Sequence, residues 1–293
     1  MREDLPQPIT SLLRTRRFWF GAFALLALSS AGIVQAKEQA SREDRNVRIV
    51  ETKSANGGTT ISAQLTNCTE ATISLSLTLE NASTSCPVPL VVDAAGRKSF
   101  ELVTVRADDK RRPWTYRLQY RWKPGRRGEV KASTFAYLLP YREETHEVIQ
   151  ADFGKFSHQE GSGDEHAIDW DMPVGTPVLA ARAGTVVGLR TDSDVGGNDV
   201  KFKHAYNYVI IRHEDGTFGE YGHLKTGGVA VKLGQQLKAQ ERLGLSGSTG
   251  FSSRPHLHFS VFQTIDGESR RTIPIQFKTA EGQIEALKEG KTY

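Results

Sequence analysis

The segment Pro255-His256-Leu257-His258-Phe259 places two imidazoles two positions apart inside an apolar run. Side chains alternate across a β-strand, so an extended backbone directs His256 and His258 to one face and Leu257 and Phe259 to the other. The second pair suits a protein core. Two neutral imidazoles on one face form a partial zinc site, although two unrelated histidines beside a loop would give the same pattern.

The composition is that of a globular protein. The chain has 293 residues, of which 38% are hydrophobic and 25% are charged, which suits one large or two medium domains. The net charge is +4 and the pI is about 9.0. A basic pI favours acidic partners such as cell-wall polymers, whereas a charge this small does not favour nucleic acid. The sequence does not indicate an oligomeric state.

The first 36 residues have the pattern of an export signal. A basic flank that includes Arg16 and Arg17 precedes an apolar run from Phe18 to Val34, and Val34-Gln35-Ala36 has the side chains that a signal peptidase needs. We expect cleavage after Ala36, which would place the mature protein in the periplasm or cell envelope. The alternative is an uncleaved membrane tether, since the run is close to spanning length.

The chain has two cysteines, Cys68 and Cys86. In an exported protein such a pair predicts a disulfide, which in the chain-entropy picture would stabilise the fold by roughly 3 kcal/mol. The alternative is two free thiols. Neither cysteine lies near the histidine-rich part of the chain, so neither is a predicted metal ligand.

An all-β domain is predicted over residues 46–139, after a polar linker at residues 37–45. The turn signal Asn56-Gly57 separates the first two strands. Short strands of this number and spacing predict an immunoglobulin-like β-sandwich. The expected strands are Val47–Thr52, Thr59–Thr66, Ala71–Leu79, Val88–Val92, Ser99–Val105, Trp114–Trp122 and Lys131–Leu138.

The strand expected at Trp114–Trp122 alternates aromatic and cationic side chains. Basic groups interleaved with aromatics could bind a glycan or a nucleic acid. The strict alternation instead favours an amphipathic strand, with its aromatic rings in the core and its cations in solvent.

A second β domain is predicted over residues 146–277, where frequent glycines indicate tight turns. A charged tail of weak helical character follows at residues 278–293. Asp169 lies within a short apolar run of this domain, and a carboxylate buried there needs a partner such as a metal. A carboxylate that caps the following turn is the alternative.

Residues 146–277 resemble the lysostaphin-type, or LytM-like, zinc metallo-endopeptidases that cut peptidoglycan cross-bridges. The resemblance implies a compact antiparallel β-sheet metallopeptidase domain and does not extend to residues 37–140. The segments that carry it, in the family's order and spacing, are Asp169–Val178, Ala180–Val186, Asn207–Thr217, Tyr221–Leu224, Gly244–Gly250 and Pro255–Phe259.

The resemblance also implies which residues bind Zn²⁺. In the family the ligands are a histidine, an aspartate and the second histidine of His-x-His, which here gives His158 or His166, then Asp169 and His258. Many relatives have the first ligand four residues before the aspartate, where this chain has Glu165. A sub-branch with a Phe-Ser-His element uses that histidine instead, so we choose His158. His166 and Asp169 would also face opposite sides of a regular strand.

The family's two histidines that do not bind zinc correspond to His223 and His256. A bound zinc with three protein ligands keeps a position for water and lowers the pKa of that water. One imidazole can then transfer the water's proton to the leaving amine, and the other can donate to the oxyanion of the tetrahedral intermediate. The sequence does not assign the two roles between them.

These features together predict an exported zinc metallo-endopeptidase that hydrolyses peptide bonds in peptidoglycan stem peptides or cross-links. One alternative is a catalytically silent regulator of other cell-wall hydrolases, since some relatives have lost zinc ligands, but this chain keeps a full set. The other is a glycan-binding wall protein that would use the aromatic strand of the first domain.

Overall fold

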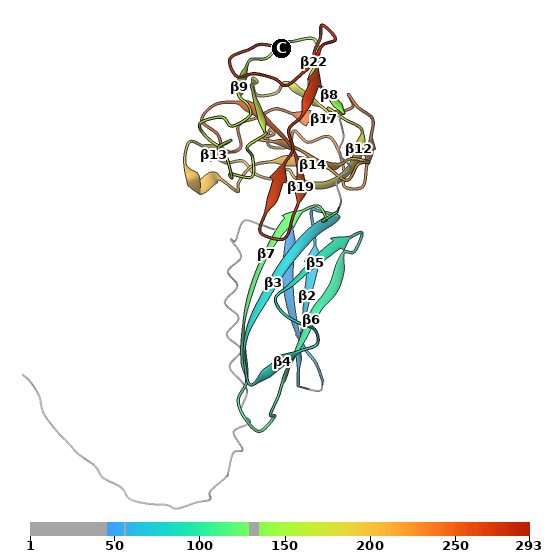
Figure 1. Ribbon diagram of the computed structural model, residues 1–293, viewed down its shortest axis with the longest axis vertical. Helices are drawn as coiled ribbons and strands as arrows, with labels where there is room; N and C mark the ends of the chain where they lie inside the picture. Colours follow the sequence, from blue (N-terminus) through green and yellow to red (C-terminus); the bar gives the residue numbers. More distant parts are fainter. Residues whose placement is uncertain (1–45, 56, 129–134) are drawn as a thin grey trace, which may run out of the picture. The chain divides into compact units, whose positions relative to one another are not determined.

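The structure, a computed structural model, describes residues 46–55, 57–128 and 135–293, and these are almost entirely β (Figure 1). Within these ranges the helical structure is a single 3₁₀ turn, η1 (Val200–Phe202). This confirms the predicted all-β class. The predicted signal peptide and linker, residues 1–45, lie outside the described residues. A search of the described residues finds no helix with the length and apolarity to span a bilayer.

The first β region, residues 47–124, consists of two antiparallel sheets with the strand orders β1-β2-β6-β4 and β5-β3-β7. One apolar cluster contains residues from both sheets, so the sheets bury their inner faces against each other. The immunoglobulin-like topology stays a prediction. The strands are β1 (Val47–Lys53), β2 (Thr59–Leu65), β3 (Glu70–Glu80), β4 (Ala82–Thr84), β5 (Leu90–Ala95), β6 (Ser99–Ala107) and β7 (Thr115–Pro124).

The aromatic strand has the amphipathic character that its sequence predicts. In β7, Tyr116 and Leu118 are buried in the apolar cluster, and Tyr120 and Trp122 pack against it. Arg117, between the two buried residues, is exposed. The aromatic rings therefore build the core of the first β region.

The disulfide predicted between Cys68 and Cys86 is not formed in this structure. The Cys86 thiol lies beside the carbonyl group of Leu102, in the middle of β6. The Cys68 thiol lies beside the carbonyl group of Asn46, which lies past the end of β6 that Lys98 precedes. Four residues of extended chain between Lys98 and Leu102 span about 13 Å. A disulfide needs Cα atoms within about 7 Å, so the prediction from compartment alone was wrong for this structure.

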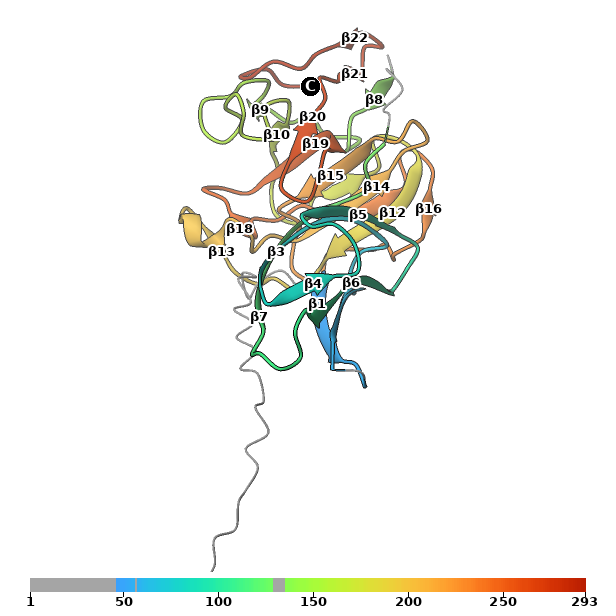
Figure 2. The same cartoon turned by 60° about the horizontal axis from the view of Figure 1, so that its bottom comes forward.

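The second β region, residues 136–293, is built on an eight-stranded sheet with the order β16-β12-β14-β15-β19-β10-β9, to which β20 adds by pairing with β19 (Figure 2). Every pairing in this sheet is antiparallel. The strands are β9 (Val148–Gln150), β10 (Ile168–Asp171), β12 (Gly184–Arg190), β14 (Tyr208–Arg212), β15 (Phe218–Gly222), β16 (Gln236–Leu237), β19 (His256–Thr264) and β20 (Arg270–Thr272).

Smaller sheets flank this one, and they change two expectations from the sequence. The strand expected at Lys131–Leu138 is described only as β8 (Ala136–Leu138), which pairs with β21 (Gln276–Lys278) and packs Tyr137 into the core of the second region. The predicted tail is not helical, since it contains β22 (Ile284–Glu285) and buries Leu287. The other pairs join β11 (Pro177–Leu179) to β17 (Arg242–Leu245) and β13 (Gly196–Gly197) to β18 (Gly250–Phe251).

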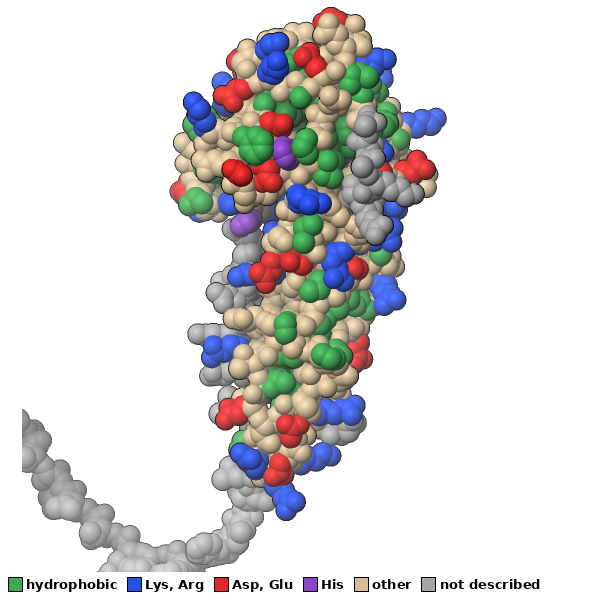
Figure 3. Space-filling model, in the orientation of Figure 1, with side chains coloured by type: hydrophobic (Ala, Val, Ile, Leu, Met, Phe, Trp, Pro, Cys, Tyr) green, Lys and Arg blue, Asp and Glu red, His purple; other side chains and the backbone are tan. Residues whose placement is uncertain are grey.

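The two faces of the eight-stranded sheet have different chemistry. On one face Trp170, Tyr221, Leu257 and Phe259 are fully buried in the apolar core. Alternate residues of the same strands point to the other face, which carries the polar residues Asp169, Glu220 and His258 and also a smaller buried apolar cluster that includes Phe218 and Phe262. On the molecular surface in Figure 3, acidic and basic side chains are interspersed and do not form one large patch of a single sign.

Candidate metal centre

Asp169 and His258 face each other across two neighbouring strands. The register of β10 and β19 pairs Asp169 with His258 and Trp170 with Leu257. Because side chains alternate, this register sends the acid and the imidazole to one face and the two apolar residues to the core. The Nδ1 atom of His258 lies 2.9 Å from Oδ1 of Asp169.

His158 approaches the same carboxylate from the loop between β9 and β10. Its side chain is completely buried, and its Nδ1 atom lies 3.4 Å from the carbonyl oxygen of Ala151. A carbonyl only accepts, so this contact places the ring proton on Nδ1 and leaves the lone pair on Nε2. The Nε2 atom lies 3.4 Å from Oδ2 of Asp169 and has no hydrogen-bond partner.

Gln150 fixes the approach of this loop. Its side-chain carbonyl accepts hydrogen bonds from the backbone N–H groups of Phe156 and Ser157, at 2.9 and 3.0 Å. Its amide donates to Oδ2 of Asp169, at 3.0 Å. The side chain therefore connects the loop that carries His158 to the aspartate. Sequence analysis missed Gln150, because a single glutamine in a short strand carries no local signal of this role.

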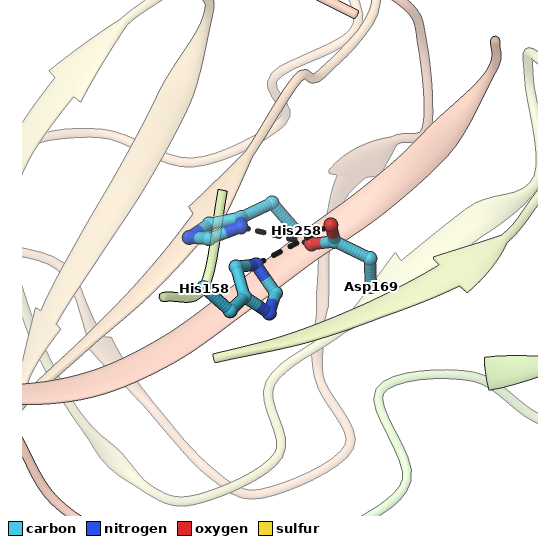
Figure 4. A group of neighbouring side chains, drawn as sticks. All are labelled: His158, Asp169 and His258. Atoms are coloured by element: carbon cyan, nitrogen blue, oxygen red, sulfur yellow. Dashed lines mark hydrogen bonds and ion pairs between the residues drawn. The ribbon is translucent and has the colours of Figure 1, made fainter. Parts of the chain in front are cut away.

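The three predicted ligands form a compact donor set, with one donor atom of each of His158, Asp169 and His258 within 4.8 Å of the others (Figure 4). Two imidazole nitrogens and one carboxylate oxygen are ligands that Zn²⁺ takes in catalytic sites. The buried Nε2 atom without a hydrogen-bond partner is also what a metal ligand requires before binding. The residues present therefore fit a zinc ion.

His166, the alternative first ligand, points elsewhere. Its Nδ1 atom lies 3.6 Å from Oδ1 of Asp152, and its ring packs edge-on against Phe153 at a centroid distance of 5.1 Å. It does not belong to the donor set around Asp169.

The rings of His223 and His256 pack against each other beside the donor set, tilted by 44° and with centroids 4.4 Å apart. The Nδ1 atom of His223 lies 2.7 Å from the carbonyl oxygen of Thr249, and that of His256 lies 2.8 Å from the carbonyl oxygen of Arg254. Each neutral ring therefore carries its proton on Nδ1 and keeps an accepting Nε2. His223, His256, Asp169 and His258 line one groove of about 850 Å³, whereas the His158 side chain is completely buried behind it.

The backbone of His223 is in the left-handed region, with φ at +58°. A residue other than glycine adopts this conformation rarely and at some cost in energy. The turn directly follows β15 and brings the imidazole against His256. The preceding Gly222 lies opposite His258, where an added Cβ would come within 3.3 Å of the His258 Cβ.

The charges of these groups follow from burial and from their neighbours. Burial alone would raise the pKa of Asp169, but the neighbouring imidazoles of His158 and His258 hold it well below its usual value. Burial alone would lower the pKa of His258, yet the Asp169 hydrogen bond and charge raise it to about 9. Burial lowers the pKa of His223 to about 3, helped by the neighbouring histidines, so this ring is neutral at pH 7.

The sequence profile of Peptidase family M23 matches residues 163–271. Residues 163–271 of the second β region are a Peptidase M23 domain. This confirms the resemblance to the lysostaphin-type enzymes. The matched segment includes Asp169, His223, His256 and His258, while His158 precedes it.

Curated relatives of this M23 domain include several named endopeptidases. The chain is 38% identical over 93 residues to the peptidoglycan DD-endopeptidase ShyA of Vibrio cholerae, which covers 32% of this chain and 19% of ShyA. It is 30% identical over 131 residues to the glycyl-glycine endopeptidase ALE-1 of Staphylococcus capitis, which covers 44% of this chain and 33% of ALE-1. The matches thus span only about a fifth to a third of these relatives.

Among solved structures, the catalytic domain of lysostaphin from Staphylococcus simulans is 26% identical to this chain. The comparison covers 44% of this chain and 87% of the lysostaphin chain, with a TM-score of 0.31.

Proposed function

We propose that this chain is an exported zinc-dependent endopeptidase that hydrolyses peptide bonds of peptidoglycan. The observation that carries the proposal is the donor set of His158, Asp169 and His258 within 4.8 Å. The packed pair His223 and His256 lies in the groove that Asp169 and His258 also line. The names of the M23 relatives, a DD-endopeptidase and a glycyl-glycine endopeptidase, support the substrate class. The basic and apolar pattern of residues 14–36 supports export.

His158 through Nε2, Asp169 through its carboxylate and His258 through Nδ1 would hold the zinc ion. When bound, zinc lowers the pKa of a water molecule and polarises a carbonyl group. Asp169 also serves the free protein, because its carboxylate accepts from His258 and so keeps that ring aimed at the common centre.

His223 is suited to accept a proton. Its Nδ1 donates to the Thr249 carbonyl, which leaves the Nε2 lone pair available to accept a proton. In this role Nε2 takes a proton from the attacking water and returns it to the leaving amine. His256 would then stabilise the oxyanion of the tetrahedral intermediate in its doubly protonated form, because Nδ1 donates to the Arg254 carbonyl and Nε2 needs a second proton to donate to the oxyanion.

Digestion of purified peptidoglycan by the full chain tests the proposal. The zinc-loaded protein should release new free amines, and mass analysis of the fragments should locate the cleaved peptide bond. A chelator should stop the release and added zinc should restore it. An Asp169→Asn variant should stay inactive under both conditions. Zinc-loaded protein that binds peptidoglycan but cleaves no bond would contradict the proposal and favour a regulator.

A further inference from the structure

A buried ion network borders the candidate metal centre and has no part in the roles assigned so far. Arg270, on β20, donates from Nη2 to Oδ1 of Asp164 and from Nη1 to Oε2 of Glu220. The Arg270 side chain is 14% exposed and that of Glu220 only 2%. The guanidinium carbon also lies 4.7 Å from the centroid of the Phe262 ring. Both ends of the guanidinium are thus occupied, which leaves it poorly suited to bind a substrate carboxylate.

One end of this network reaches a predicted zinc ligand. Oδ1 of Asp164 lies 3.8 Å from Nε2 of His258, on the side of the ring opposite Nδ1, which faces Asp169. In the free protein Nδ1 donates to Asp169. When Nδ1 gives up its proton to bind a metal, the ring keeps the proton on Nε2, and the negative charge of Asp164 favours it there. Metal-binding histidines usually have a carboxylate or carbonyl beside their second ring nitrogen.

The other end reaches the proposed proton acceptor. Oε1 of Glu220 accepts a hydrogen bond of 2.6 Å from the hydroxyl group of Tyr206. The Tyr206 ring packs against His223, with centroids 5.5 Å apart. Arg270 therefore connects, through two carboxylates, the residues that contact His258 and His223.

We infer that Arg270, Asp164, Glu220 and Tyr206 form a positioning network that orients His258 for metal binding and His223 for proton transfer. The inference rests on the proposed function and adds to it. All four residues also line the groove, but in this role they act on the two histidines. Asp164 acts through His258, and Tyr206 acts through His223, so the two ends have separable effects.

Replacement of Arg270 would leave Glu220 buried without a countercharge and could unfold the chain, so the test uses the two ends. For the first end, Asp164→Asn keeps the shape and an acceptor for Arg270 but removes the charge beside His258. We expect zinc affinity, measured by competition with a chromophoric chelator, to fall about 10- to 100-fold. Asp152→Asn is the matched control, because Asp152 lies beside His166 and outside the network. The zinc affinity of this variant should equal that of the wild type.

For the second end, Tyr206→Phe removes the hydroxyl group that Glu220 holds and keeps the ring. We expect kcat to fall roughly tenfold, and at most about 100-fold, with KM and zinc affinity unchanged. Tyr208→Phe is the control, since the Tyr208 hydroxyl contacts Asn46 instead of Glu220.

The outcomes separate the inference from the proposed function. If Asp164→Asn has the zinc affinity of the wild type, or Tyr206→Phe has the kcat of the wild type, the inferred positioning network is refuted. The proposed endopeptidase activity would not be affected by either result. A wild-type chain that binds no zinc and cleaves no peptidoglycan would refute the proposed function itself. A purely structural role for the network would lower the melting temperature of both variants without the split between zinc affinity and kcat.

Discussion

The two faces of the central sheet in the second β region differ in chemistry although they alternate along the same strands. In β10, Asp169 faces the donor set and its neighbour Trp170 is fully buried in the apolar core. In β19, His258 and Leu257 divide in the same way. One face stabilises the fold, and the other holds buried polar groups that need partners.

This difference predicts a rigid candidate metal centre. Two of its three ligands lie on hydrogen-bonded strands whose opposite face is packed, so a shift of either ligand would disturb the core. Sites on strands are held more accurately than sites on loops. The third ligand, His158, comes from a loop, and Gln150 connects that loop to Asp169.

The largest expected effect comes from Asp169→Asn on the polar face. A structural zinc site shares about 10–16 kcal/mol of binding energy among four ligands, so the loss of one should weaken zinc binding by about 100-fold or more. Peptidoglycan cleavage should fall to the level seen with a chelator. Asp171→Asn is the control, because Asp171 lies two residues further along the same face and outside the donor set. If Asp169→Asn kept the zinc affinity of the wild type, Asp169 would not be a zinc ligand.

His223→Ala should separate catalysis from metal binding on the same face. Loss of a general acid–base group lowers the rate about 10²- to 10⁴-fold, and zinc affinity should stay at the wild-type value because His223 is outside the donor set. Steady-state kinetics with chelator competition measure both quantities. Replacement of the exposed His204 by alanine is the control. If zinc affinity fell by the same factor as the rate, His223 would be identified as a zinc ligand instead.

Leu257→Ala tests the apolar face. Truncation of a fully buried leucine costs about 2–5 kcal/mol of unfolding free energy. Urea denaturation followed by tryptophan fluorescence measures this cost, and the folded variant should bind zinc normally. Ile265→Ala, at an exposed leucine-sized side chain, should change stability by no more than about 0.5 kcal/mol. Equal effects of the two variants would contradict the division between the faces.

A comparison of two buried histidines gives a pH-dependent prediction. His258 has Asp169 as its partner, whereas His213 lies away from the donor set, with Nδ1 2.9 Å from the Ala183 carbonyl and Nε2 without a partner. Burial lowers the pKa of His213 to about 4. The unfolded chain, with a pKa near 6.5, therefore binds this proton first as the pH falls.

The contribution of His213 to stability should be complete above about pH 6.5 and lost progressively down to about pH 4. The loss amounts to roughly 3 kcal/mol, from about 2.5 pH units at 1.36 kcal/mol each. His213→Asn keeps a donor for Ala183 and removes the titration. The unfolding free energy of the variant should thus depend less on pH than that of the wild type over this range. Equal slopes of unfolding free energy against pH in the two proteins would refute a lowered pKa for His213.

Local alternation made much of this architecture predictable. The pattern around His256 and His258 predicted which side chains share a face, and the amphipathic pattern of β7 predicted its buried aromatics. The same pattern could not place β8, whose partner β21 lies almost 140 residues further along the chain. The cysteine pair was misassigned because compartment rules contain no information on the distance between Cys68 and Cys86.

The candidate centre was predictable where its residues form motifs and not where they act singly. Asp169, His258 and the Phe-Ser-His element lie in segments that resemble known relatives, and the structure brings all three together. Gln150 and Arg270 are isolated polar residues in the sequence. Their positions depend on strand register and loop packing, which no local pattern encodes.

The zinc content of the purified full chain tests the central claim most directly. After dialysis against buffered zinc, the account predicts one tightly bound zinc ion in the wild type and in His166→Ala, and none in His158→Ala. Retention of zinc by His158→Ala together with its loss from His166→Ala would contradict the donor set on which the proposed function rests.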